Sequence, residues 1–197
     1  MRAFAELYAA LDGSTSTTAK VEALVRYFGI APARDAAWAT YFLAGGKPRA
    51  VVGSRALREF ALAASGLPAW LFEESYQAVG DLAETIAHLL PPPARVGDLG
   101  LAQWIEERLL PLRGLAPGEV LARLRDYADE LDGTGRFLLI KLIGGGFRVG
   151  VSRLLVTRAL ARHGGLDARL VAQRLIGYTD SAQLPSAERF LALVAPA

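Results

Sequence analysis

The residues of this sequence that are best suited to chemistry are ones that bind anions. Glycines and small residues at 144–152 lead into an arginine-bearing segment, and a helix start there offers unpaired backbone N–H groups to a phosphate. Residues 14–18 all bear hydroxyls and precede Lys20, and residues 45–49 form a Gly-Gly-Lys-Pro-Arg loop. Each stretch alone is typical of a capped helix or a turn. Together they favour contact with a phosphate backbone.

The candidate phosphate contacts come from these three stretches. Glycines permit close backbone approach, while hydroxyl and cationic side chains supply hydrogen-bond donors. The candidates are Ser14, Thr15, Ser16, Thr17, Lys20, Lys47, Arg49, Gly144, Gly145, Gly146, Arg148, Gly150, Ser152 and Arg153.

Charge is distributed unevenly along the chain. The net charge is only +2, but residues 136–174 hold eight basic residues and one acidic residue, and residues 61–135 carry a net charge of −7. A local charge of +7 favours a polyanion such as nucleic acid. Alternatively, some of these arginines pair with acidic neighbours such as Asp126, Asp129 or Glu130, or lie over the core with their heads in water.

The glycine stretch fits neither common nucleotide-binding template. A dinucleotide fingerprint that starts at Gly144 needs glycine where Val149 stands. A P-loop that starts at Gly145 needs lysine where Val151 stands. The sequence also has no G-x-S-x-G elbow, H-E-x-x-H pair or EF-hand loop, so we expect no catalytic residue in this chain.

Apolar residues recur at helical spacing along nearly the whole chain, with glycines and prolines between the periodic segments. Hydrophobic residues make up 52% of the 197 positions, enough for a sizeable core. The pattern predicts an all-α fold, a compact bundle of about ten to twelve short helices in two lobes, with a possible lobe boundary near 91–97. Helices are expected around residues 4–11, 21–28, 36–44, 54–65, 68–79, 82–90, 99–109, 117–131, 136–143, 151–163, 167–175 and 187–194. Ser54 and Asp81 are the expected caps of the fourth and sixth helices, and Gly66 is expected just past the end of the fourth.

Composition and the pattern of apolar residues argue against disulfide-bonded, metal-binding, secreted and membrane-spanning proteins. Cysteine is absent and the two histidines, His88 and His163, lie far apart, so we expect no disulfide framework and no metal site. Both histidines are predicted to be structural helix residues, His163 in a last turn. Residues 1–10 lack the pattern of a signal peptide, and no apolar stretch reaches the ~18 residues of a membrane span. We therefore expect a cytoplasmic protein without membrane contact.

Six stretches of the sequence match a pattern of motifs that one protein family has in the same order along the chain. The most specific are Gly-Asp-Leu-Ala-Glu at 80–84 and Lys-Leu-Ile-Gly-Gly-Gly-Phe-Arg-Val-Gly-Val-Ser at 141–152. Over nearly its whole length the chain resembles the N-terminal DNA-binding domain of ATP-dependent DNA ligases, and most closely the bacterial multi-domain kind. The four weaker stretches lie at residues 4–12, 14–21, 41–45 and 70–76.

The resemblance implies an all-helical domain that binds the minor groove of nicked duplex DNA on both sides of the break. Such a domain holds the DNA against the nucleotidyltransferase and OB-fold domains of the same polypeptide, which use ATP, Mg²⁺ and a lysine in a K-x-D-G motif. None of Lys20, Lys47 and Lys141 is followed by x-Asp-Gly. We therefore expect this chain to need no cofactor and to be inactive alone, as a domain fragment or as a product without the catalytic half. The parent enzyme is expected to be a nucleoid-associated repair ligase, and this chain a monomer.

Two other function classes remain open. A helical protein-interaction scaffold would use the acidic and basic segments for docking or self-association, and it would oligomerise in a salt-sensitive way without DNA affinity. A small-molecule enzyme would need a nucleophile–base pair or a metal cluster, and the sequence offers neither.

Overall fold

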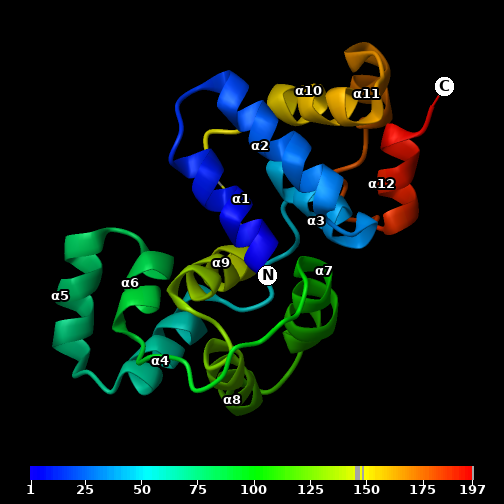
Figure 1. Ribbon diagram of the computed structural model, residues 1–197. Coiled ribbons are helices and arrows are strands. Elements are labelled where there is room, and N and C mark those ends of the chain that lie inside the picture. Colours follow the sequence, from blue (N-terminus) through cyan, green and yellow to red (C-terminus); the bar gives the residue numbers. More distant parts are fainter. Residues whose placement is uncertain (145–146, 148, 197) are drawn as a thin grey trace. The chain divides into compact units, whose positions relative to one another are not determined.

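The computed structural model describes residues 1–144, 147 and 149–196 (Figure 1). These residues form twelve α-helices, a π-helical stretch and a 3-10 turn, and no strand occurs among them. The predicted all-α class is confirmed. The chain divides into two compact units. Unit 1 comprises Met1–Arg49, Gly100–Ala102 and Gly146–Ala197, and unit 2 comprises Ala50–Leu99 and Gln103–Gly145.

Unit 1 is organised by two pairs of packed helices. α2 packs against α10, and α3 packs against α12, while α1 contacts α2 and α11 contacts α10 (Figure 1). The helices of this unit are α1 (Arg2–Asp12), α2 (Thr17–Ile30), α3 (Ala33–Leu43), α10 (Arg153–Gly164), α11 (Ala168–Arg174) and α12 (Ala187–Val194).

The core of unit 1 is centred on α3, which is buried at every position from Ala36 to Leu43. A helix that is apolar on all sides is stable only when other elements surround it. The fully buried ring of Trp38 stacks on Phe42, with ring centroids 5.8 Å apart, and lies edge-on to Tyr41. α3 therefore gives unit 1 a rigid aromatic centre.

Unit 2 contains the acidic segment. α6 packs against α9, α4 packs against α8, and α5 contacts α6 (Figure 1). Its core includes the buried side chains of Phe60, Phe72, Ile86, Trp104 and Leu124. The elements of this unit are α4 (Ser54–Ser65), α5 (Ala69–Val79), α6 (Leu82–Leu89), the π-helix η1 (Trp104–Leu109), the 3-10 helix η2 (Leu110–Leu112), α8 (Pro117–Ala128) and α9 (Gly133–Gly144).

The helix expected over 99–109 is the element that differs most from its prediction. It begins as the short α7 (Leu101–Gln103) and continues as η1 and η2. Its start is set from outside, because the carboxylate of Asp35 in α3 accepts hydrogen bonds from the N–H groups of Leu101 at 3.1 Å and Ala102 at 2.9 Å. A helix N-terminus needs such acceptors for its unpaired donors.

The segment 91–97 does not separate the two units, since it lies inside unit 2. Backbone hydrogen bonds attach it to the end of α8: the N–H of Arg95 donates to the carbonyl of Asp129 at 3.2 Å, and the N–H of Gly97 donates to the carbonyl of Glu130 at 3.0 Å. The triple proline is thus a turn within this unit. The chain passes between the units at 49–50, 99–100, 102–103 and 145–146.

Candidate nucleic-acid interface

The loop before α10 is anchored at Phe147 by aromatic packing in unit 1. The Phe147 ring lies 5.5 Å from the ring centroids of Phe4 and Tyr8 in α1, and 5.6 Å from that of Phe42 in α3. Aromatic pairs at such separations add stabilisation beyond their buried area. The sequence shows Phe4 and Phe42 as core residues, but no local pattern links them to Phe147.

Lys20 holds the same loop at a second place, after Phe147. The side chain is buried, with 7% of its surface exposed, and its Nζ donates to the carbonyl oxygens of Val149 at 3.0 Å and Gly150 at 3.1 Å. The stretch at 14–20 and the end of the glycine stretch, which the sequence predicted separately, therefore come together. The Lys20 ammonium is directed at protein carbonyls.

Gly150 has a backbone conformation that favours glycine. Its φ is +59°, in the left-handed region. A Cβ at this position would also lie 2.8 Å from the Nζ of Lys20. The left-handed turn therefore favours glycine, and a side chain here would displace the ammonium of Lys20.

The N-termini of α2 and α10 flank the contact between Lys20 and the loop carbonyls. Ser16 caps α2, because its hydroxyl oxygen accepts from the N–H of Ala19 at 3.3 Å, and Ser14 accepts from the N–H of Ser16 at 3.1 Å. Ser152 caps α10 by accepting from the N–H of Leu155 at 3.4 Å. A hydroxyl that accepts in this way still has its own proton to donate. The two caps belong to α2 and α10, which pack against each other.

The other predicted contacts are placed as follows. Thr15, Thr17, Lys47 and Arg49 lie at exposed positions of unit 1. Arg153 donates to the carbonyl of Leu175 at the end of α11, so its guanidinium joins two helices. Gly144 is the last residue of α9 and lies in unit 2. Gly145, Gly146 and Arg148 lie outside the described residues.

Backbone carbonyls are the partners of several arginines of the basic segment. Arg174 donates to the carbonyls of Ala195 at 2.6 Å and Leu193 at 3.2 Å. Arg158 and Arg162, by contrast, are exposed on α10, and no partner for either occurs in the part of the chain that the structure describes. This exposed pair was not singled out among the sequence candidates, although its four-residue spacing on a helix was visible.

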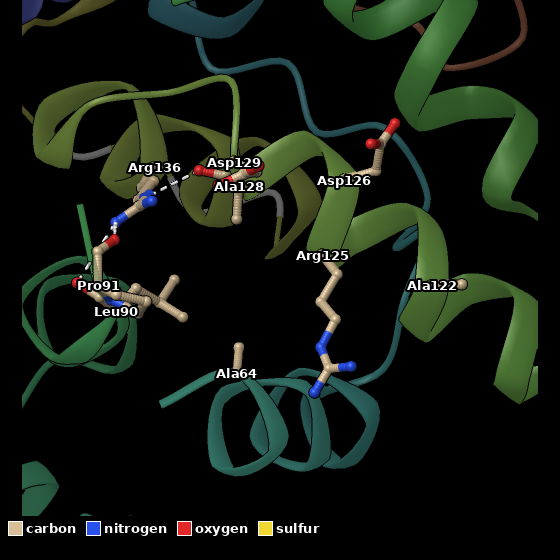
Figure 2. Close-up of a pocket in the computed structure, with 9 residues that line it drawn as sticks. All are labelled: Ala64, Leu90, Pro91, Ala122, Arg125, Asp126, Ala128, Asp129 and Arg136. Carbon is tan, nitrogen blue, oxygen red and sulfur yellow. Dashed lines mark hydrogen bonds between the residues drawn. The ribbon is translucent and has the colours of Figure 1, made fainter. Parts of the chain in front are cut away.

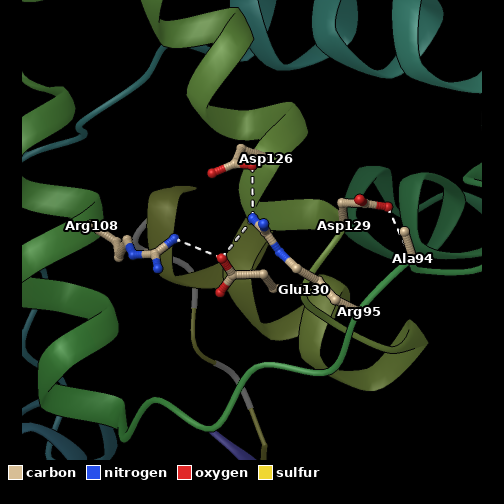
Figure 3. A network of polar contacts seen from close by, with 6 residues as sticks. All are labelled: Ala94, Arg95, Arg108, Asp126, Asp129 and Glu130. Carbon is tan, nitrogen blue, oxygen red and sulfur yellow. Dashed lines mark hydrogen bonds and ion pairs between the residues drawn. The ribbon is translucent and has the colours of Figure 1, made fainter.

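Of the acidic neighbours proposed for the basic segment, Asp129 lies near Arg136, whereas Asp126 and Glu130 pair with other arginines. Arg95 contacts Asp126 at 2.7 Å and Glu130 at 2.8 Å, and Arg108 contacts Glu130 at 3.2 Å (Figure 3). Both arginines belong to the acidic segment itself. Neutralisation there is local because the loop before α7 and the helix η1 lie beside the end of α8 within unit 2.

Arg136 of the basic segment is buried in unit 2, with 4% of its surface exposed. It donates to the carbonyls of Ala128 at 2.7 Å, Pro91 at 2.6 Å and Leu90 at 3.4 Å (Figure 2). Burial lowers the pKa of Arg136, and the nearby carboxylates of Asp129 and Asp132 oppose that shift. The guanidinium thus satisfies carbonyls at the ends of α6 and α8.

A pocket of about 420 Å³ lies beside this arginine (Figure 2). Its apolar lining comes from Ala64, Leu90 and Ala122, and Arg125 at its edge donates to the carbonyl of Ala63 at 2.9 Å. Of the polar residues in the lining, Arg125 and Arg136 bind backbone carbonyls, Asp126 pairs with Arg95, and Asp129 accepts from the N–H of Ala94. They offer no nucleophile paired with a base.

Among the residues that the structure describes, no group of three or more histidines, cysteines, aspartates or glutamates is placed to hold a metal ion. His88 and His163 are helix residues, as predicted, and they lie in the last turns of α6 and α10. None of the helices in the described part of the chain has the length and apolar character of a membrane span.

The family model described as DNA ligase N terminus matches residues 1–161. The chain belongs to this family. It is thus an N-terminal domain of the ATP-dependent DNA ligase type, and the match includes the Lys20 contact, Gly150 and the first turns of α10. Among curated proteins, no sequence matches this ligase domain. α11 and α12 follow the matched residues.

Proposed function

We propose that this ligase domain binds duplex DNA at a nick, through the minor groove and the phosphate backbone, and positions the break for the catalytic domains of the same polypeptide. The observation that carries the proposal is the loop ending in Gly150 and Ser152, fixed at Phe147 and by Lys20 at the start of α10. Backbone amides at such a helix start, together with the helix dipole, suit a phosphate.

The chemistry of this surface supports binding that is independent of base sequence. Serine hydroxyls, backbone amides and cations position a duplex through its phosphates and sugars. The exposed Lys47, Arg49, Arg158 and Arg162 add positive charge in unit 1. We propose the same role for Arg148, which lies outside the described residues.

The reaction itself is assigned to other domains. Under this proposal, ATP and Mg²⁺ act in the catalytic part of a bacterial repair ligase in the nucleoid-associated cytoplasm, and this domain contributes DNA binding as a monomer. The paired carboxylates of Asp126 and Glu130 argue against an acidic docking surface at that point, because both are already neutralised within unit 2.

Fluorescence anisotropy of the 197-residue chain with labelled DNA tests the proposal. A nicked duplex, an intact duplex of the same sequence and a single strand are each titrated over a salt series. We expect tighter binding to duplex than to single strand, and a steep decrease in affinity with salt, of about 0.9 in log K per log salt for each neutralised phosphate. A preference for the nicked duplex supports positioning at a break. Absence of duplex binding at low salt contradicts the proposal, and salt-sensitive oligomers in light scattering would then favour the interaction scaffold.

A further inference from the structure

Lys20 occupies a position that helix electrostatics disfavours. Ser16 is the N-cap of α2, so Lys20 lies at the fourth helical position, near the positive end of the helix dipole. The side chain is also buried, and in the described part of the chain no carboxylate pairs with it. The two carbonyls of Val149 and Gly150 are its recorded partners. The ammonium therefore serves the conformation of the loop.

The two hydrogen bonds of Lys20 fix which way the adjacent amides point. In a planar trans peptide, the N–H is directed opposite to the C=O of the same unit. Because Lys20 binds the oxygens of Val149 and Gly150, the N–H groups of Gly150 and Val151 face away from Lys20. In the described part of the chain, neither N–H has an intramolecular acceptor.

The conformation of Gly150 adds to this arrangement. Successive N–H groups beside a left-handed residue form a concavity that binds anions. Gly150 is exposed and has a φ of +59°, while Val149 beside it is buried. The carbonyl side of this loop faces a buried cation, and the N–H groups of Gly150 and Val151 face the other side.

We infer that Lys20 is a positioning residue, which binds the carbonyls of Val149 and Gly150 so that the amides of Gly150 and Val151 bind a phosphodiester of the DNA backbone. This inference rests on the DNA-binding function proposed above. It differs from the sequence-based prediction, in which Lys20 itself contacts a phosphate. The two roles have different dependences on salt.

Salt dependence of DNA binding separates the two roles in K20M, with K47M as the matched control. Methionine keeps an apolar stem at position 20 and removes the ammonium. If Lys20 positions the loop, K20M lowers the affinity for nicked duplex roughly tenfold at every salt concentration and leaves the slope of log K against log salt unchanged. K47M removes an exposed cation, and we expect its slope to become shallower by ~0.9. A decrease of ~0.9 in the slope of K20M would overturn the inference in favour of a direct phosphate contact.

Amide hydrogen exchange in the DNA-free protein provides a second readout. In K20M, exchange at Gly150, Val151 and Ser152 is expected to accelerate at least tenfold, while exchange in the core of α3 stays as in the wild type. Unchanged exchange at the loop amides would overturn the inference. If the wild type does not bind duplex DNA, the proposed function fails, yet this measurement still decides whether Lys20 orders the loop.

G150A tests the same contact from the loop side and covers the case in which K20M does not fold. Its Cβ would displace the Nζ of Lys20 and strain a left-handed residue. We expect the same loss of affinity at constant salt slope. In the double variant the losses should not add, because both changes remove one contact. Wild-type affinity in G150A, or additive losses in the double variant, would contradict the inference.

Discussion

Lys20 in unit 1 and Arg136 in unit 2 are both buried cations that donate to backbone carbonyls, but they stabilise different structures. Lys20 binds two successive carbonyls of a loop, at Val149 and Gly150. Arg136 binds carbonyls at the ends of α6 and α8, two helices of the unit 2 core. The same chemistry therefore holds a loop in one unit and the ends of packed helices in the other.

The two units also neutralise their charged side chains differently. In unit 2, several described arginines pair with carboxylates, as Arg95 and Arg108 do with Glu130 (Figure 3), although Arg125 and Arg136 donate to backbone carbonyls. In unit 1, Arg153 and Arg174 donate to backbone carbonyls instead. A carbonyl does not cancel a full positive charge. Unit 1 therefore keeps a positive potential that favours a polyanion.

The largest effect on stability is expected for Arg136→Met. This change leaves up to three carbonyls at helix ends without their donor, and each buried unsatisfied group costs about 1–3 kcal/mol. Allowing for partial relaxation, we expect the free energy of unfolding to fall by about 3 kcal/mol in urea titrations. DNA affinity of the folded fraction should stay close to that of the wild type, in contrast to K20M.

Arg123→Met is the matched control for this prediction. Arg123 lies on α8 and forms an exposed ion pair with Glu119 at 3.0 Å, so its removal should change the urea midpoint little. Equal losses in the two variants, or a large loss of DNA affinity in Arg136→Met alone, would contradict the division of roles between the two buried cations.

A smaller effect is expected for Asp81→Asn, which tests the Asp81–Lys141 ion pair of unit 2. Asp81 caps α6 through the N–H of Glu84 at 3.0 Å. Burial raises the pKa of Asp81, but the hydrogen bonds from Lys141, Glu84 and Ala83 outweigh burial and lower it below its ordinary value. The charged form is thus favoured in the folded state, and this stability is present above the ordinary aspartate pKa and lost as pH falls through the lowered one.

Asparagine keeps the cap and removes the charge, so it isolates the ion pair. We expect Asp81→Asn to lower the free energy of unfolding by no more than about 1 kcal/mol at pH 7, because the pair is partly exposed. The difference from the wild type should shrink as pH falls below about 4. A difference that is constant from pH 7 to pH 2 would show that the charge of Asp81 does not contribute.

The elements that the sequence predicted well are those determined by near neighbours. α12 (Ala187–Val194) has the predicted bounds. Asp81 caps α6, because its carboxylate accepts a hydrogen bond from the N–H of Glu84, three residues later. Gly66 and Gly80 end α4 and α5 in the left-handed conformation that favours glycine. Each of these features is encoded within a few residues.

Features that depend on distant partners could not be predicted from the sequence. The start of α7 is set by Asp35, which lies 66 residues earlier in the chain than Leu101. The partner of Lys20 lies 129 residues away, so the residue type suggested a phosphate contact, while the fold directs its ammonium to Val149. The spacing of apolar residues and the positions of turn residues predict secondary-structure elements, but they do not specify which polar groups come into contact in the fold.

The smallest effect is expected for Arg158→Gln on the exposed face of α10. Arg158 and Arg162 are four residues apart, so their like charges are neighbours on the helix, and in the described part of the chain neither has a partner. Relief of this repulsion should raise the free energy of unfolding by about 0.3 kcal/mol at low salt, and the gain should vanish at high salt.

The same change should weaken duplex binding and reduce the salt slope by up to ~0.9 if Arg158 contacts a phosphate. Weaker DNA binding in a more stable protein would show that unit 1 maintains this charge for its ligand, and loss of stability at low salt would show instead that Arg158 supports the fold, as Arg136 does in unit 2.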